Sequence, residues 1–254
     1  MTRSVLTLLF VVVALVRAPA AQVVSDRNQR DALQHYRAGE EAMHGERLDV
    51  AEREFRESVK LDPLLHLAHY GLGQVFMRTK RYPLAVLAYL DARAAFRTGA
   101  AQALQDETAY QRQIDDQIRA LEDAKRSFEG NGPRAKVPDV NSTLLRIDTQ
   151  INQLRNQRRR NPDKPTEVPG WISLALGSAY FRTDAMVDAE REYREATKVE
   201  PKLGEAHNNL AVVLMLTGRL EEAEREMKAA EKSGFRVNPQ FKDDLKQRAK
   251  NARP

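Results

Sequence analysis

Histidine is the residue type with which this chain could most readily bind a metal ion or transfer a proton. Three of its five histidines, His35, His69 and His207, recur at one position of a repeated pattern, where Ser173 stands in the remaining repeat. His66 lies three residues before His69, so two imidazoles could share one helix face. Two imidazoles without a third ligand make a weak zinc site. Recurrence at a packing position therefore predicts a structural role for these side chains.

The sequence also lacks the residues and motifs that other kinds of catalysis require. The sequence has no cysteine, which excludes disulfides, thiolate catalysis, cysteine-linked lipids and cysteine-type zinc sites. It contains no HExxH pattern, no glycine-rich phosphate loop and no recognisable arrangement of Ser, His and an acid. The 36 acidic residues are dispersed, so no carboxylate pair stands out. We therefore expect a protein that is not an enzyme and that uses no cofactor and no metal.

The distribution of charge argues against a polyanion as the partner. The formal net charge is +5, and charged residues of both signs make up 30% of the chain. Such a mixture is typical of helical surfaces covered with ion pairs, so nucleic acid is not an expected partner. One basic run could contact an anionic surface, but cations at a helix C-terminus also interact favourably with the helix dipole, and we favour that interpretation. The run consists of Arg155, Arg158, Arg159, Arg160 and Lys164.

The elements that position these residues follow a repeat. Four blocks match one another at a spacing of 34 residues, interrupted once, so that equivalent positions are separated by 34, 104 and 34 residues. The equivalent positions are Gly39, Gly73, Gly177 and Ala211; Ala51, Ala85, Ala189 and Ala223; and Phe55, Tyr89, Tyr193 and Met227. Each block contains two helical patterns separated by a short polar turn. This period indicates stacked helical hairpins, in which the small residue lets the partner helix and its large side chain approach closely.

The blocks resemble the tetratricopeptide repeat family. Its motif of Leu-Gly, an aromatic, Ala, Phe or Tyr, Ala and Pro is matched in the third block by Leu176, Gly177, Tyr180, Ala189, Tyr193, Ala196 and Pro201. The second block supplies Leu72, Gly73, Phe76, Ala85, Tyr89 and Ala92, and the fourth supplies Leu210, Ala211, Leu214, Ala223, Met227 and Ala230. Arg97 and Phe235 stand where the family often has proline. The resemblance implies an all-α solenoid of helical hairpins, and together with the N-terminal segment described below it indicates an exported protein of bacterial type.

The resemblance also implies a concave groove, lined by the first helix of each unit, that receives an extended or helical peptide. By repeat position, the groove residues are Tyr36, Tyr70, Leu174 and Asn208, then Glu40, Gln74, Ser178 and Val212, then Met43, Met77, Phe181 and Met215. The three methionines form either an adaptable apolar strip or core filler. Arg78 and Arg182 lie at the groove edge. We therefore predict a non-catalytic scaffold whose partner is a protein or a peptide.

The interruption predicts a second structural feature. Residues 98–169 lack the repeat signature, and two apolar sets keep coiled-coil spacing on either side of a break rich in Gly and Pro. The sets are Ile114, Ile118, Leu121 and Phe128, and Val140, Leu144, Ile147, Ile151 and Leu154. We predict an inserted antiparallel helical hairpin, with two eroded repeats as the alternative. The hairpin could drive homo-oligomerisation, and it could split the groove into two short surfaces.

Both ends of the chain differ from the repeats. Arg3 precedes an apolar run from Val5 to Val16, and Ala18 to Ala20 offer small residues for cleavage, as in a secretory signal peptide. The run is shorter than the roughly 20 residues that span a bilayer, so we expect no stable membrane insertion. At the other end, Asn238 and Pro239 predict the start of a helix with an apolar stripe.

The predicted organisation therefore has six parts. Residues 1–20 form a signal peptide cleaved near Ala20, which would leave a periplasmic or secreted protein. A linker, 21–30, precedes the first repeat pair, 31–97. The hairpin insertion, 98–169, is followed by the second repeat pair, 170–236, and by a C-terminal capping helix and tail, 237–254. The capping helix would cover the exposed end of the stack.

Overall fold

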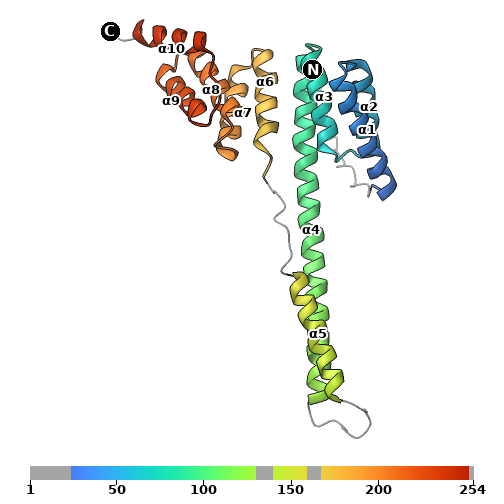
Figure 1. Ribbon diagram of the computed structural model, residues 1–254. Helices are drawn as coiled ribbons and strands as arrows, with labels where there is room; N and C mark the ends of the chain where they lie inside the picture. Colours follow the sequence, from blue (N-terminus) through green and yellow to red (C-terminus); the bar gives the residue numbers. More distant parts are fainter. Residues whose placement is uncertain (1–23, 130–139, 159–166, 252–254) are drawn as a thin grey trace, which may run out of the picture.

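A computed structural model describes residues 24–129, 140–158 and 167–251, and all the elements in these ranges are α-helices (Figure 1). The helices are α1 (Asp26–His44), α2 (Leu48–Leu61), α3 (His66–Arg78), α4 (Tyr82–Glu129), α5 (Val140–Arg158), α6 (Gly170–Arg182), α7 (Met186–Val199), α8 (Gly204–Leu216), α9 (Leu220–Lys232) and α10 (Pro239–Asn251). The predicted all-α solenoid of helical hairpins is confirmed. The predicted signal peptide, the Gly- and Pro-rich break, and Arg159, Arg160 and Lys164 lie outside the described residues.

Close packing within each hairpin explains the small residue of the repeat. Phe55 on α2 is 1% exposed. A Cβ built on Gly39 of α1 or on Gly71 of α3 would lie 2.6 Å from its ring. The ring therefore fits between two helices only because neither position carries a side chain. Glycine inside a helix costs about 1 kcal/mol relative to alanine, and the buried ring offsets that cost.

The four hairpins stack as one array despite the insertion. Leu176 and Ala179 of α6 belong to the same buried cluster as Tyr89 of α4. Arg93 of α4 donates hydrogen bonds of 3.0 and 2.9 Å to both carboxylate oxygens of Glu192 on α7. The insertion therefore does not separate the two repeat pairs, contrary to the expectation of two short surfaces, because the chain leaves and re-enters the array at neighbouring positions.

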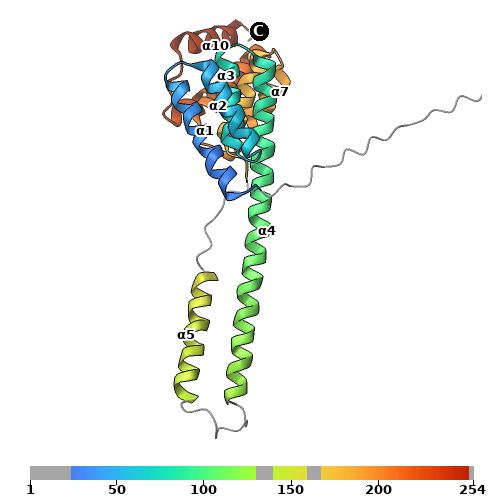
Figure 2. The same ribbon diagram turned by 90° about the vertical axis from the view of Figure 1, so that its right-hand side faces the viewer.

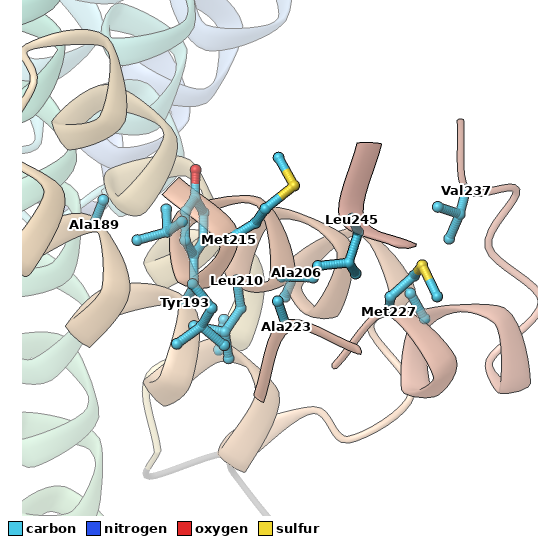
Figure 3. Close-up of a cluster of buried hydrophobic side chains, with 14 of the residues drawn as sticks. Ala189, Tyr193, Ala206, Leu210, Met215, Ala223, Met227, Val237 and Leu245 are labelled. Carbon is cyan, nitrogen blue, oxygen red and sulfur yellow. The ribbon is translucent and has the colours of Figure 1, made fainter. Parts of the chain in front are cut away.

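The second pair and the last helix share a buried cluster (Figure 3). Leu245 of α10 is 2% exposed, and Val237, just before this helix, is 3% exposed, in the same cluster as Met227 of α9. The side-chain oxygen of Asn238 accepts a hydrogen bond of 2.9 Å from the backbone N–H of Gln240 at the start of α10. Asn238 thus caps the N-terminus of α10, and α10 packs against the last repeat unit.

Helix α4 runs without interruption from the second hairpin into the insertion, so residue 98 is not an element boundary (Figure 2). Its distal part packs along α5 through the buried residues Ile114, Ile118, Ile147 and Ile151, with Leu121 and Leu154 beside them. Ion pairs flank this seam, Lys125 to Asp148 at 2.7 Å and Arg155 to Glu122 at 2.9 Å. The side chains of Phe128 and Val140, predicted members of the seam, lie outside those described. No helix in the described ranges has both the length and the apolarity to cross a membrane.

The turns inside the hairpins share one backbone feature. Glu46, Lys80, Asp184 and Gly218, at equivalent repeat positions, have φ values of 56, 59, 62 and 79°. A left-handed residue at this point ends the first helix and reverses the chain. Only the fourth unit has glycine there, and Gly45 of the first unit lies one residue too early. The sequence therefore located the turns but not the residue that makes them.

Candidate functional site

The predicted groove residues lie on α1, α3, α6 and α8, and four of them meet in one pocket. Tyr36 and Glu40 of α1, with Tyr70 and Gln74 of α3, line a pocket of ≈ 240 Å³. Leu67, Gly71 and Trp171 complete its wall. The pocket therefore draws residues from three repeat units, including the unit that follows the insertion.

Aromatic rings form most of this wall, and buried rings hold them in place. The ring of Tyr70 packs edge-on against Trp171, with centroids 4.6 Å apart. Two buried rings support the tyrosines. The ring centroids of Tyr70 and Tyr89 are 5.3 Å apart, and those of Tyr36 and Phe55 are 5.9 Å apart. These distances lie in the range of favourable aromatic pairs. Because Phe55 and Tyr89 are the large residues of the repeat, the core packing also fixes the rings of the pocket.

Two carboxylates act on the tyrosines of the pocket: Glu40, which lines it, and Glu205 on α8. Burial raises the pKa of the Tyr36 phenol, and a hydrogen bond to Glu40 and the charge of Glu40 raise it further. The pKa of Tyr70 is also raised, mainly by burial and partly by the charge of Glu205 on α8. Both tyrosines therefore stay neutral at physiological pH and present rings and hydroxyl groups, not charges.

Trp171, which lines the pocket, and Glu205, whose charge acts on Tyr70, were not among the residues predicted from the sequence. Both occupy the second residue of their helices, and Leu33 and Leu67 stand at the equivalent position of the first two units. Extending the alignment of the repeats by one more position would have found them. Trp171 is also the only tryptophan in the chain, which makes it a reporter of this pocket.

Two predicted groove residues are buried and cannot line an open surface. Leu174 is 8% exposed and Met215 is 7% exposed, and both belong to the buried cluster that the second repeat pair shares with α10. Met215 therefore fills the core, which was one of the two interpretations of the methionines. Phe181 packs against the same cluster and stays half-buried. Ser178 donates its hydroxyl to the carbonyl oxygen of Leu174 at 2.9 Å. The third and fourth units thus contribute fewer open apolar positions than the repeat alignment implied.

The remaining groove residues are half-buried or exposed. Met43 and Met77 are half-buried against the buried cluster that contains Phe55 and Tyr89, whereas Asn208 and Val212 are half-buried on α8. The edge residue Arg78 donates to the carbonyl oxygen of Met43 at 3.1 Å and to Glu46 at 3.4 Å. This arginine is thus already engaged within the protein.

Two of the three recurrent histidines join the two helices of their unit, and the third contacts the turn before its own helix. His35 lies 2.8 Å from Glu54, and His207 lies 2.6 Å from Glu226. His69 approaches the carbonyl oxygen of Pro63 at 3.0 Å. Among the described residues, no group of three His, Asp or Glu side chains could hold a metal ion. These contacts fit the structural role predicted from the recurrence of histidine.

Comparison with known proteins gives matches to one kind of repeat. A family model described as tetratricopeptide repeat matches residues 36–101 and 174–234, together half of the chain. Among solved structures, the chain is similar to PilW, a type IV pilus biogenesis factor, at 15% identity and a TM-score of 0.40, covering 87% of both chains. It is also similar to PilF of Pseudomonas aeruginosa, at 14% identity and a TM-score of 0.36, covering 89% of this chain and 91% of that one. No curated protein sequence matches this chain.

Proposed function

Because this chain belongs to the tetratricopeptide repeat family, we propose that it is a non-catalytic adaptor that binds a peptide or protein segment along α1, α3, α6 and α8. Tetratricopeptide repeat proteins bind protein or peptide partners. We also propose export after removal of the signal peptide near Ala20, which the mass of the protein recovered from cells would check. A mass that still includes residues 1–20 would contradict cleavage.

One observation carries the groove proposal. Tyr36, Tyr70 and Trp171, from three consecutive units, meet at a single open pocket, together with the polar groups of Glu40 and Gln74. Binding sites commonly combine apolar and aromatic walls with a few convergent polar groups. The volume of ≈ 240 Å³ is below the roughly 300–1,000 Å³ of drug-sized ligand sites, which suits one side chain of a longer segment.

Charge at two half-buried apolar positions should abolish partner capture. With Met77→Glu and Phe181→Glu together, we expect at least tenfold weaker recovery of bound proteins, because two carboxylates in the groove would lose hydration on contact with an apolar segment. The measurement is a pull-down from extract, quantified by mass spectrometry.

The matched control is Val187→Glu, since Val187 lies on α7 and is 80% exposed. Circular dichroism must show that the double variant and the control both keep their helical content. Recovery of the same proteins by the groove variant and by the parent would show that binding occurs elsewhere.

The hairpin of α4 and α5 supports a second candidate function, self-association. Large apolar side chains are exposed along it: Leu104 by 58%, Tyr110 by 48% and Leu145 by 70%. Under this proposal the parent sediments as an oligomer, and replacing all three residues with glutamate yields a monomer. A parent that sediments as a monomer at micromolar concentration would rule the proposal out.

A further inference from the structure

The pocket of Tyr36, Tyr70 and Trp171 includes the carboxylate of Glu40, and the charge of Glu205 on α8 also acts on Tyr70. Among the described residues, neither Glu40 nor Glu205 forms an ion pair, whereas carboxylates on the second helices of the units are paired. Glu52 bonds to Arg56 and Arg81, and Glu190 to Arg194 and Arg219. The charge of the groove carboxylates is therefore available to a ligand.

Among the described residues, three basic side chains of α3 and α6 form no ion pair with Glu40 or Glu205. His66 lies beside Trp171, with ring centroids 6.3 Å apart, but burial lowers the pKa of its imidazole and so favours the neutral form. Arg78, on the same helix as Tyr70, bonds to Glu46 and to the carbonyl oxygen of Met43. Arg182 acts electrostatically on Tyr193 of the third unit, as Glu205 also does.

The aromatic and apolar side chains that line the pocket also favour a cationic ligand. Electron-rich faces of tryptophan and tyrosine attract ammonium and guanidinium groups, most strongly where water is excluded. The long apolar stems of lysine and arginine pack against such rings while the head group reaches polar partners. Leu67 and Gly71 complete a wall that an aliphatic stem could contact.

We propose that this pocket receives an arginine or lysine side chain of the bound segment, with its stem on Tyr70 and Trp171 and its charge balanced by Glu40 and Glu205. The inference rests on the proposed groove function and specifies its partner: a peptide with a basic anchor residue. An acidic peptide would face two uncompensated carboxylates and is disfavoured.

A peptide selection tests the chemistry without a known partner. Random 12-residue peptides displayed on phage are selected against the protein lacking residues 1–20, and enriched peptides are synthesised. We expect the enriched sequences to share one Arg or Lys. Replacing that residue with neutral citrulline or norleucine should weaken binding about tenfold or more in calorimetry.

Variants of the protein locate the contact. Glu40→Gln together with Glu205→Gln should remove most of the preference for the basic peptide over its neutral form. Glu57→Gln, which alters a half-exposed carboxylate of α2 paired with Lys60 at 3.3 Å, should leave that preference unchanged. A change in Trp171 fluorescence on binding would place the peptide at the pocket.

The outcomes separate this inference from the groove function. Peptides that bind through the Met77 and Phe181 face but share no basic residue, or that bind equally well with citrulline, would overturn the basic anchor and leave groove binding intact. Enriched peptides whose affinity is unchanged by the groove variant would overturn both, as would a selection that enriches no peptide over an unrelated protein.

Discussion

Replacing Phe55 with alanine should lower the free energy of unfolding by about 3–5 kcal/mol, the range for a buried phenylalanine in a packed core. The ring is 1% exposed and is held between α1 and α3. Its loss would leave a cavity that spans the junction of the first two units, and it would also release Tyr36, whose ring is 5.9 Å away. Urea unfolding followed by circular dichroism measures the change.

A second substitution tests the reason for the glycines. In the parent, Gly71→Ala would place a Cβ 2.6 Å from the ring of Phe55, so we expect a loss of about 1–3 kcal/mol from overpacking. In the Phe55→Ala background the same change should stabilise the protein by about 1 kcal/mol, because alanine is the better helix former and the cavity accepts its methyl group. The effect of one substitution would thus reverse its sign.

Gly99 provides the matched control for this cycle. It lies inside α4, and a Cβ built there would have no neighbour within 4 Å. Gly99→Ala should therefore stabilise the protein by about 1 kcal/mol in both backgrounds. A cost for Gly71→Ala that is equal in both backgrounds would show that the glycine serves some purpose other than admitting the ring.

The parts of the fold that the sequence predicted are those where one packing requirement recurs. The pairing of a small residue with a large one sixteen positions later, as in Gly39 and Phe55, is repeated often enough to reveal both the hairpins and their register. The capping helix was also predictable, since Asn238 and Leu245 satisfy local rules for a helix start and an apolar stripe. Local and periodic constraints of this kind are visible without any structure.

The features that could not be predicted depend on contacts between distant residues. No local signal ends α4 after the second unit, and Gly99 in its interior costs too little to break it. The meeting of Trp171 with Tyr70 depends on where α6 re-enters the array after the insertion. Burial of Leu174 and Met215 likewise reflects the packing of the second pair, which the repeat alignment does not specify. The repeat thus predicted on which helices the candidate groove residues lie, but not how exposed each side chain is.

The second large effect on stability is expected at the ion pair of Arg93 and Glu192, which joins the two repeat pairs. Arg93→Ala should cost about 3 kcal/mol or more, because it leaves the carboxylate of Glu192, which is 2% exposed, without its main partner. Arg191 remains 3.4 Å from Glu192, but its side chain is 61% exposed and compensates only weakly. We therefore expect the lower end of the range of about 3–5 kcal/mol for breaking a buried pair.

The control variants separate charge burial from packing. Arg93→Met combined with Glu192→Leu removes both charges and should recover most of the lost stability. Arg194→Ala, which breaks a more exposed contact with Glu190, should cost less than about 1 kcal/mol. A double variant no more stable than Arg93→Ala would assign the effect to packing at the junction and not to the unpaired carboxylate.

Unfolding of the Arg93→Ala variant should also become less cooperative. In stacked repeats, stability is the sum of the units and of the interfaces between neighbours, so weakening a single interface uncouples the two sides. Since Arg93 belongs to α4 and Glu192 to α7, the weakened interface is the one between the repeat pairs. We expect a broader urea transition for this variant, with Trp171 fluorescence and far-ultraviolet circular dichroism no longer coinciding. Coincident transitions in both the parent and the variant would mean that other contacts, such as Leu176 against Tyr89, are sufficient to couple the two pairs.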